Sequence, residues 1–224
     1  MLLAIGEIVL VMLGILLAIQ VDNWNQSRQD RKTEKVLLKE INEEFRYNKA
    51  EFLGNMGRYD QVRVHLREIR GFFPIKLDEI DLDTMSSLLR EIVFQGNYDP
   101  STTSINKLKS TASLNIISDD ELRYLLIKWE TLLEDFLKDE KIALDYHQNI
   151  FAIVMSQKLP RPYRKYIRDP RVDHSFLESL EFQGLIDHKY RSVHNMFRTL
   201  ENDRDVNLLT VMNRIIELTD SPKS

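Results

Sequence analysis

The first 21 residues form a nearly unbroken apolar run, MLLAIGEIVLVMLGILLAIQV. A helix rises about 1.5 Å per residue, so about 20 apolar residues cross the hydrocarbon core of a bilayer. A cleaved signal peptide would have a basic start, a shorter apolar core and a small-residue cleavage site. This run has no basic residue, is long, and is followed by polar Asp-Asn-Trp-Asn. The pattern therefore predicts a transmembrane helix over residues 1–21 rather than a signal peptide.

From residue 36 to residue 69, apolar side chains recur at steps of three and four residues, which is typical of an amphipathic helix. They are Leu38, Ile41, Phe45, Phe52, Met56, Tyr59, Val62, Leu66 and Ile69. Because residues 15–53 contain neither Pro nor Gly, we expect the apolar segment to continue through the juxtamembrane residues 22–35 as one rod. Gly54 and Gly57 weaken the middle of this helix and mark a candidate bend. They also interrupt a coiled-coil seam, so bundle packing is favoured over a coiled-coil stalk.

The rest of the chain reads as further helices separated by turns. They are expected over residues 82–95 after a cap at Asp81 or Asp83, over 102–112 with Ile105 and Leu108 inward, from Ser118 to Lys158, and from Ser175 to Ile216 with a candidate break at Gly184. Ser118 and Glu121 match the S-x-x-E capping box directly before an apolar-periodic run. No strand-like alternation longer than four residues stands out. The predicted fold is all-α, with an N-terminal transmembrane helix continuing into a multi-helix bundle domain over residues 36–220.

Charge and composition exclude several classes of protein. Residues 22–224 carry 31 basic and 34 acidic side chains, and this near balance argues against a nucleic-acid partner, which normally requires a clear basic excess. The chain has no Cys, which excludes disulfides, thiolate metal sites and cysteine nucleophiles. The absence of Cys is compatible with cytoplasm and periplasm alike.

No motif assigns catalysis, a metal or a cofactor. The five histidines are His65, His147, His174, His188 and His194. No two of them have the i, i+4 spacing of a helical zinc site, and there is no H-E-x-x-H or Glu-x-x-His pair. The acid clusters at residues 81–83 and 119–121 are explained by helix capping. Gly-rich phosphate loops, nucleophile elbows and dinucleotide fingerprints are missing. We expect no cofactor, and the sequence favours a non-enzyme over an enzyme without deciding between them.

Three residues of the apolar segment share one helical face. Glu7, Gly14 and Ala18 fall at i, i+7 and i+11, and Gly14-x-x-x-Ala18 is a small-xxx-small pattern that permits close helix approach. A carboxylate in lipid is costly unless it faces a partner or water. The face is therefore a candidate transmembrane contact with a membrane-protein partner or a second copy. The alternative is an ordinary lipid-facing surface with Glu7 near the membrane edge. Trp24 is the expected interface anchor, because indoles favour the headgroup layer.

A basic loop is the most distinctive polar feature of the domain. Five cations, interleaved with two tyrosines, lie between prolines: Arg161, Arg164, Lys165, Arg168 and Arg171. They form a candidate patch for anionic lipid headgroups. The competing interpretation is a solvated loop that pairs with acidic residues of the surface.

Two stretches resemble a family of uncharacterised membrane proteins of Bacteroidetes. The first is AIGEIVLVMLGILLAIQVDNWNQ, in which Gly6-Glu7 opens the span and an Asn-Trp-Asn box at residues 23–25 closes it. The second, residues 98–141, resembles the family's central block, although Thr103 and Ala112 stand where small glycines are usual. The resemblance implies a single-pass protein of the bacterial inner membrane. It implies no activity, because the family is a domain of unknown function.

The side of the membrane that holds the domain stays open. Cations at residues 28–39 follow the span, and the positive-inside rule then places the domain in the cytoplasm. A basic leader of the kind found in the family would reverse this orientation. The expected function is a membrane-anchored scaffold or subunit that acts through protein–protein contacts and the lipid bilayer. The alternative is a membrane-tethered enzyme or ligand-binding sensor whose site is built from dispersed residues.

Overall fold

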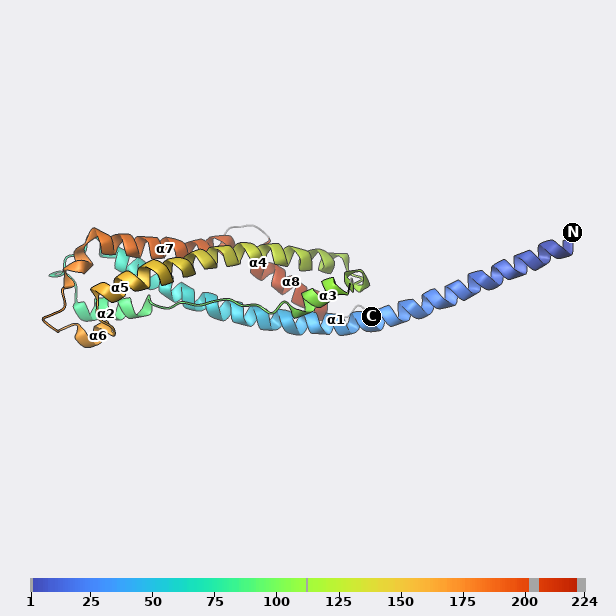
Figure 1. Cartoon of the computed structure of the whole chain (residues 1–224), viewed down its shortest axis with the longest axis horizontal. Helices are drawn as coiled ribbons and strands as arrows, with labels where there is room; N and C mark the ends of the chain where they lie inside the picture. Colours follow the sequence, from blue (N-terminus) through green and yellow to red (C-terminus); the bar gives the residue numbers. More distant parts are fainter. Residues whose placement is uncertain (1, 112, 202–205, 221–224) are drawn as a thin grey trace. The chain divides into compact units, whose positions relative to one another are not determined.

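The structure is a computed structural model that describes residues 2–111, 113–201 and 206–220, and their side chains except those of residues 2–9, 199 and 201. Every regular element within these ranges is helical, which confirms the predicted all-α class and multi-helix bundle (Figure 1). The elements are α1 (Leu2–Gly71), α2 (Leu82–Glu91), α3 (Thr103–Ser110), η1 (Ser113–Ile116), α4 (Asp120–Tyr146), η2 (His147–Phe151), α5 (Ala152–Lys158), α6 (Tyr163–Tyr166), η3 (His174–Glu178), α7 (Leu180–Glu201) and α8 (Leu208–Asp220).

Helix α1 is a single helix of 70 residues, which confirms that the apolar segment and the first amphipathic segment are continuous. Gly54 and Gly57 lie inside it and neither ends it. The helix stops at Gly71, shortly before Pro74, whose backbone nitrogen has no hydrogen to donate.

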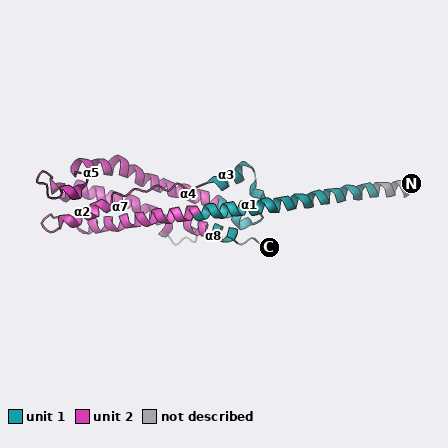
Figure 2. Cartoon of the chain, turned by 90° about the horizontal axis from the view of Figure 1, so that it is seen from below, with its two compact units in different colours: residues 1–46, 102–126, 214–224 teal, residues 47–101, 127–213 magenta. Residues whose placement is uncertain are grey.

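The chain divides into two compact units, coloured separately in Figure 2. Unit 1 comprises residues 1–46, 102–126 and 214–224, and unit 2 comprises residues 47–101 and 127–213. Helices α1, α4 and α8 each contribute to both units.

Unit 1 packs part of α1 against α3 and short stretches of α4 and α8. Its buried apolar side chains are Leu37, Ile41, Phe45, Ile105, Leu108, Ile117, Leu122, Leu125, Leu126, Ile215 and Ile216. Helix α3 begins without a side-chain cap, and the backbone N–H of Ser104 instead donates to the carboxylate of Glu44 at 2.7 Å. Asn42 is buried and donates to the carbonyl oxygen of Ile216 at 3.0 Å. Polar groups of α1 thus fix the positions of α3 and α8 within this unit.

The predicted capping box at the start of α4 is wrong by one residue. The carboxylate of Asp119, not the hydroxyl of Ser118, accepts the backbone N–H three residues further on, at 3.0 Å. The two carboxylate oxygens of Glu121 bind the Arg214 guanidinium, at 2.7 and 3.0 Å. The capping box predicts that Glu121 contacts the N-terminus of its own helix. In the structure its carboxylate instead pairs with Arg214 of α8.

We expect Asp119→Ala to lower the free energy of unfolding by about 1 kcal/mol, because a helix-terminal N–H loses its acceptor. Ser118→Ala is the matched control and should change stability little. Urea unfolding of the full chain in detergent, followed by circular dichroism, measures both. A larger loss from the Ser118 variant would restore the capping box and contradict the structure.

The long helix predicted after residue 118 ends at Lys158 as expected, but it is not uniform. The π-helical segment η2 separates α4 from α5. Such segments insert an extra residue into a helix and often occur at functional sites. Here η2 contains His147, which is buried.

The last predicted helix is divided differently. Gly184 does not break α7, since its neighbours Phe182, Leu185 and Ile186 are buried and their packing outweighs the glycine penalty of about 1 kcal/mol. A separate helix, α8, begins after Asn207, whose side chain accepts the backbone N–H of Thr210 at 2.9 Å. The helix expected from Ser175 to Ile216 therefore corresponds to the 3-10 helix η3 and the two α-helices α7 and α8, and it does not break at Gly184.

Unit 2 has an aromatic centre. The Phe52 ring of α1 lies 5.1 Å from the rings of both Tyr98 and Phe136, each in an edge-to-face arrangement. Other large side chains that are fully buried here are Tyr59, Leu66, Ile69, Met85, Ile92, Trp129, Phe151 and Phe182. The core of this unit is filled by apolar groups from α1, α2, α4 and α7.

Candidate functional site

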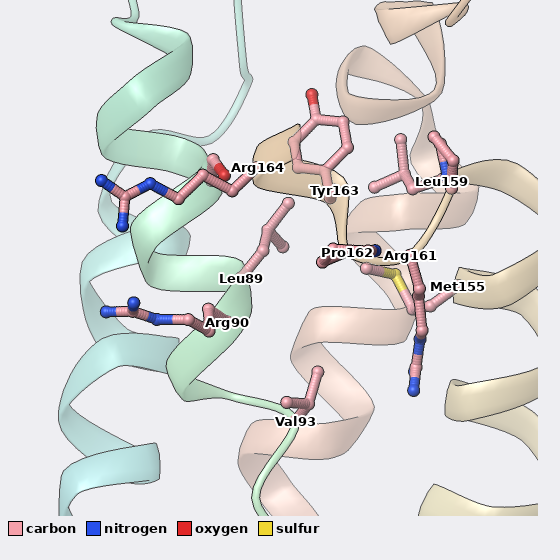
Figure 3. A pocket seen from close by; sticks show the side chains of 11 residues that line it. Leu89, Arg90, Val93, Met155, Leu159, Arg161, Pro162, Tyr163 and Arg164 are labelled. Carbon is pink, nitrogen blue, oxygen red and sulfur yellow. The ribbon is translucent and has the colours of Figure 1, made fainter. Parts of the chain in front are cut away.

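An apolar pocket of about 420 Å³ lies in unit 2, between α2 and the segment that runs from the end of α5 into α6. Small-ligand sites usually measure about 300–1,000 Å³. The lining residues are Ser86, Leu89, Arg90, Val93, Met155, Leu159, Pro160, Arg161, Pro162, Tyr163 and Arg164. Figure 3 shows the side chains of Leu89, Met155 and Pro162 between these segments, and the long side chains of Arg161 and Arg164 extending away on different sides.

Three polar groups of the lining have unused hydrogen-bonding capacity. The hydroxyl of Ser86 is buried and has no hydrogen-bond partner among the described residues. Arg161 and Arg164 are exposed, and neither forms an ion pair or hydrogen bond with any residue that the structure describes. Arg90 differs, because its guanidinium pairs with Glu91 at 2.8 Å. The lining contains no Asp, Glu or His.

The basic loop predicted as a lipid-headgroup patch is divided in the structure. Arg168 pairs with Asp83 of α2 at 2.7 Å, and Arg171 pairs with Asp169 at 2.6 Å. Hydrogen bonds from Arg171 lower the pKa of Asp169 to about 2. Two of the five cations therefore pair with acidic residues, as the solvated-loop interpretation expects. Arg161 and Arg164 instead line the pocket, and headgroup binding stays a prediction.

A buried lysine and histidine form a pair that no sequence motif indicated. The ammonium of Lys189 on α7 lies 2.6 Å from Nδ1 of His147 and 4.4 Å from the centre of the Phe151 ring. Burial lowers the pKa of Lys189 to about 7. Burial and the charges of Lys189 and Arg161 lower the pKa of His147 to about 4. No carboxylate of the described residues pairs with Lys189, so this amine is partly neutral at pH 7.

A buried carboxylate holds the segment that follows α2. Both oxygens of Glu140 on α4 accept the backbone N–H of Tyr98, at 3.0 and 3.1 Å, and one accepts from Asn55 at 3.3 Å. Burial raises the pKa of Glu140 to about 7, although these hydrogen bonds oppose the rise. The contacts assign Glu140 a structural role in fixing residues 96–98.

Each of the other four histidines lies against one neighbouring side chain. His174 Nδ1 lies 2.7 Å from the hydroxyl of Tyr163, and His65 lies 3.5 Å from the carboxylate of Glu68. His188 and His194 stack on Tyr146 and Tyr190, respectively. Within the described part of the chain, no three His, Asp or Glu side chains gather closely enough to hold a metal ion.

The residues predicted to act at the membrane lie on α1. An added Cβ at Gly14 would meet no atom within 4 Å, and Ala18 is exposed. The side chain of Glu7 lies outside the described residues. Trp24 is exposed, with the Arg28 guanidinium 6.0 Å from its ring centre. No helix, within its described residues, contains a stretch long and apolar enough to cross a bilayer.

No protein-family model, curated protein or solved structure matches the chain. The geometry of the helices, the pocket and the buried pairs is therefore the basis for the functional proposals.

Proposed function

We propose that residues 1–21 anchor this chain in a membrane as a single span, and that the helical domain acts as a scaffold or subunit through protein–protein contacts. The observation that carries the proposal is the exposure of α1 between Leu10 and Val21. Nine large apolar side chains there are at least half exposed: Leu10, Val11, Met12, Leu13, Ile15, Leu16, Leu17, Ile19 and Val21. A helix that is apolar on all sides belongs in a protein core or a bilayer.

The length and borders of the segment support a span. Residues 10–21 alone cover only about 18 Å, and residues 1–9, whose side chains are not described, extend the run towards the ~30 Å of a bilayer core. At the C-terminal end of the apolar segment, an open groove of about 290 Å³ is lined by Trp24, Arg28, Arg31, Lys32 and Lys35. An indole followed by four cations suits the headgroup layer of an anionic membrane.

The proposed scaffold function is supported by the kinds of side chain that are buried in the domain and that line its pocket. Most of the buried side chains in both units are apolar, and the pocket lining lacks acids and histidines. A tethered enzyme would show a polar pocket with such groups clustered. The partner is a second copy or another membrane subunit, contacted along the face of Glu7, Gly14 and Ala18. Membership of the Bacteroidetes family and an inner-membrane address belong to the same proposal.

Cross-linking in carbonate-washed membranes tests anchor and contact face together. Single Cys residues at Val11 and Ala18 lie on the proposed face, whereas Cys at Leu13 and Leu16 lies on the opposite side of the helix. We expect all four variants in the membrane pellet, with stronger cross-linking at Val11 and Ala18, because small residues permit close approach. Gly14→Leu should weaken this cross-linking.

Two results would contradict the proposal. A soluble product beginning near Asp22 would identify the segment as a cleaved signal. Equal cross-linking at all four positions, with native partners present, would show an ordinary lipid-facing surface.

A further inference from the structure

We infer that the pocket between α2 and α6 binds an amphipathic carboxylate, whose apolar chain fills the pocket and whose anionic head meets Arg161 and Arg164. This goes beyond the scaffold function, since it assigns the domain a small-molecule ligand. Three independent observations support it: the shape and lining of the pocket, the unpaired cations at its border and the unsatisfied hydroxyl in its wall.

The size of the pocket fits a single alkyl chain. A dry cavity of about 150 Å³ holds benzene, which has six carbons, and the pocket measures about 420 Å³. A chain of about ten to twelve carbons therefore fits, with room for the head at the opening. The buried side chains of Leu89, Met155 and Leu159 provide an apolar wall. Displacing water from such a wall is the main source of affinity for an apolar chain.

The positive charges at the opening of the pocket favour a ligand with an anionic head group. Arg161 and Arg164 are three residues apart, exposed, and without an ion pair to any described residue, whereas the neighbouring Arg168 and Arg171 are paired with aspartates. Exposed side chains change rotamer in picoseconds to nanoseconds, so both guanidinium groups can turn to a bound anion. A guanidinium binds a carboxylate through two parallel hydrogen bonds.

The wall contains one further unsatisfied group. Ser86 is 2% exposed, and its buried hydroxyl lacks a hydrogen-bond partner in the described part of the chain. A buried hydroxyl without a partner is costly, and polar groups inside native proteins are nearly always paired. A ligand oxygen or a water bound with it would satisfy this hydroxyl, and a purely apolar ligand would not.

Photolabelling with a dodecanoate that carries a diazirine in its chain tests the inference in the full chain, held in lipid nanodiscs and mapped by peptide mass spectrometry. We expect labelling of peptides that contain residues 86–93 and 155–164. Unlabelled dodecanoate should compete, whereas dodecanol and dodecyltrimethylammonium should compete at least tenfold less. The double variant Arg161→Gln/Arg164→Gln should weaken labelling at least tenfold, as expected for lost hydrogen bonds to a charged group.

The matched control is Arg168→Gln/Arg171→Gln, which removes the same charge from the same loop and should leave labelling intact. Circular dichroism of both variants checks that they fold. Equal competition by all three head groups would overturn the inference, as would equal loss in the two double variants. Labelling confined to residues 1–21 would show partition into lipid and would also overturn it. None of these results bears on the anchor, which is tested by cross-linking.

Discussion

Replacing Lys189 with methionine should raise the free energy of unfolding by a few kcal/mol at pH 7. Lys189 is 3% exposed, and its ammonium contacts His147 and the Phe151 ring without a carboxylate from the described residues to balance its charge. Burying an ammonium without a carboxylate costs more than burying an apolar chain of similar length. Methionine is linear and flexible and can occupy the same space.

The pH dependence of the free energy of unfolding shows whether the buried charge of Lys189 causes the effect. The pKa of Lys189 falls from its ordinary 10.5 to about 7 in the folded chain, so between these values the unfolded chain binds more protons. The stability of the parent chain therefore rises from pH 7 to pH 10, and the penalty is fully present below pH 7. The advantage of Lys189→Met should accordingly be largest below pH 7, still be large at pH 7, and shrink towards pH 10.

Urea unfolding of the full chain in detergent at pH 7 and pH 10 measures both effects. Lys138→Met is the matched control, since Lys138 is an exposed lysine of α4 and should show little change. If the Lys189→Met variant is less stable than the parent at pH 7, or if its advantage does not vary with pH, then Lys189 is charged and satisfied in the core.

Phe52→Ala should have the largest destabilising effect, about 4 kcal/mol. The side chain is 1% exposed and forms edge-to-face contacts with Tyr98 and Phe136. Phenylalanine-to-alanine changes in cores cost about 3–5 kcal/mol, because the transfer energy is lost and a cavity remains. Since small domains are stable by only about 5–15 kcal/mol, the variant should lose much of its margin.

Leu53→Ala provides a neighbouring control on the same helix. Leu53 is 45% exposed, so removing it leaves no enclosed cavity and should cost far less. Thermal unfolding by circular dichroism compares the two variants. Similar losses at both positions would show that α1 does not present Phe52 to the core of unit 2.

Periodicity predicted the helices well because the spacing of apolar residues is a local property of the sequence and indicates which face of a helix is buried. Ile41, Phe45 and Phe52 were expected on one face of α1, and all three are buried. The cap at Asp81 was likewise readable, since a helix N-terminus needs a nearby acceptor and the carboxylate accepts from residues 83 and 84.

Contacts between residues that are far apart in the sequence could not be predicted from the spacing of apolar and polar residues. Lys189 and His147 are 42 positions apart, and nothing in either local sequence indicates burial of an amine. Glu121 matched a capping motif, but Arg214, 93 positions away, binds it instead. The sequence indicates one side of the pocket, the basic loop, whereas the opposite wall comes from α2, about 70 positions earlier in the chain, and follows only from the tertiary structure.

The continuity of α1 also fixes a rotational phase. Each residue turns a helix by about 100°, and no break separates Ala18 from the buried Ile41 and Phe45 of unit 1. The angle between the small-residue face of the apolar segment and the buried face is therefore set by the number of residues between them. Inserting one residue within 22–35 would rotate the small-residue face by about 100° relative to the buried face without changing the residues of either face. The length of this stretch therefore sets the relative orientation of the two faces as well as the distance between them.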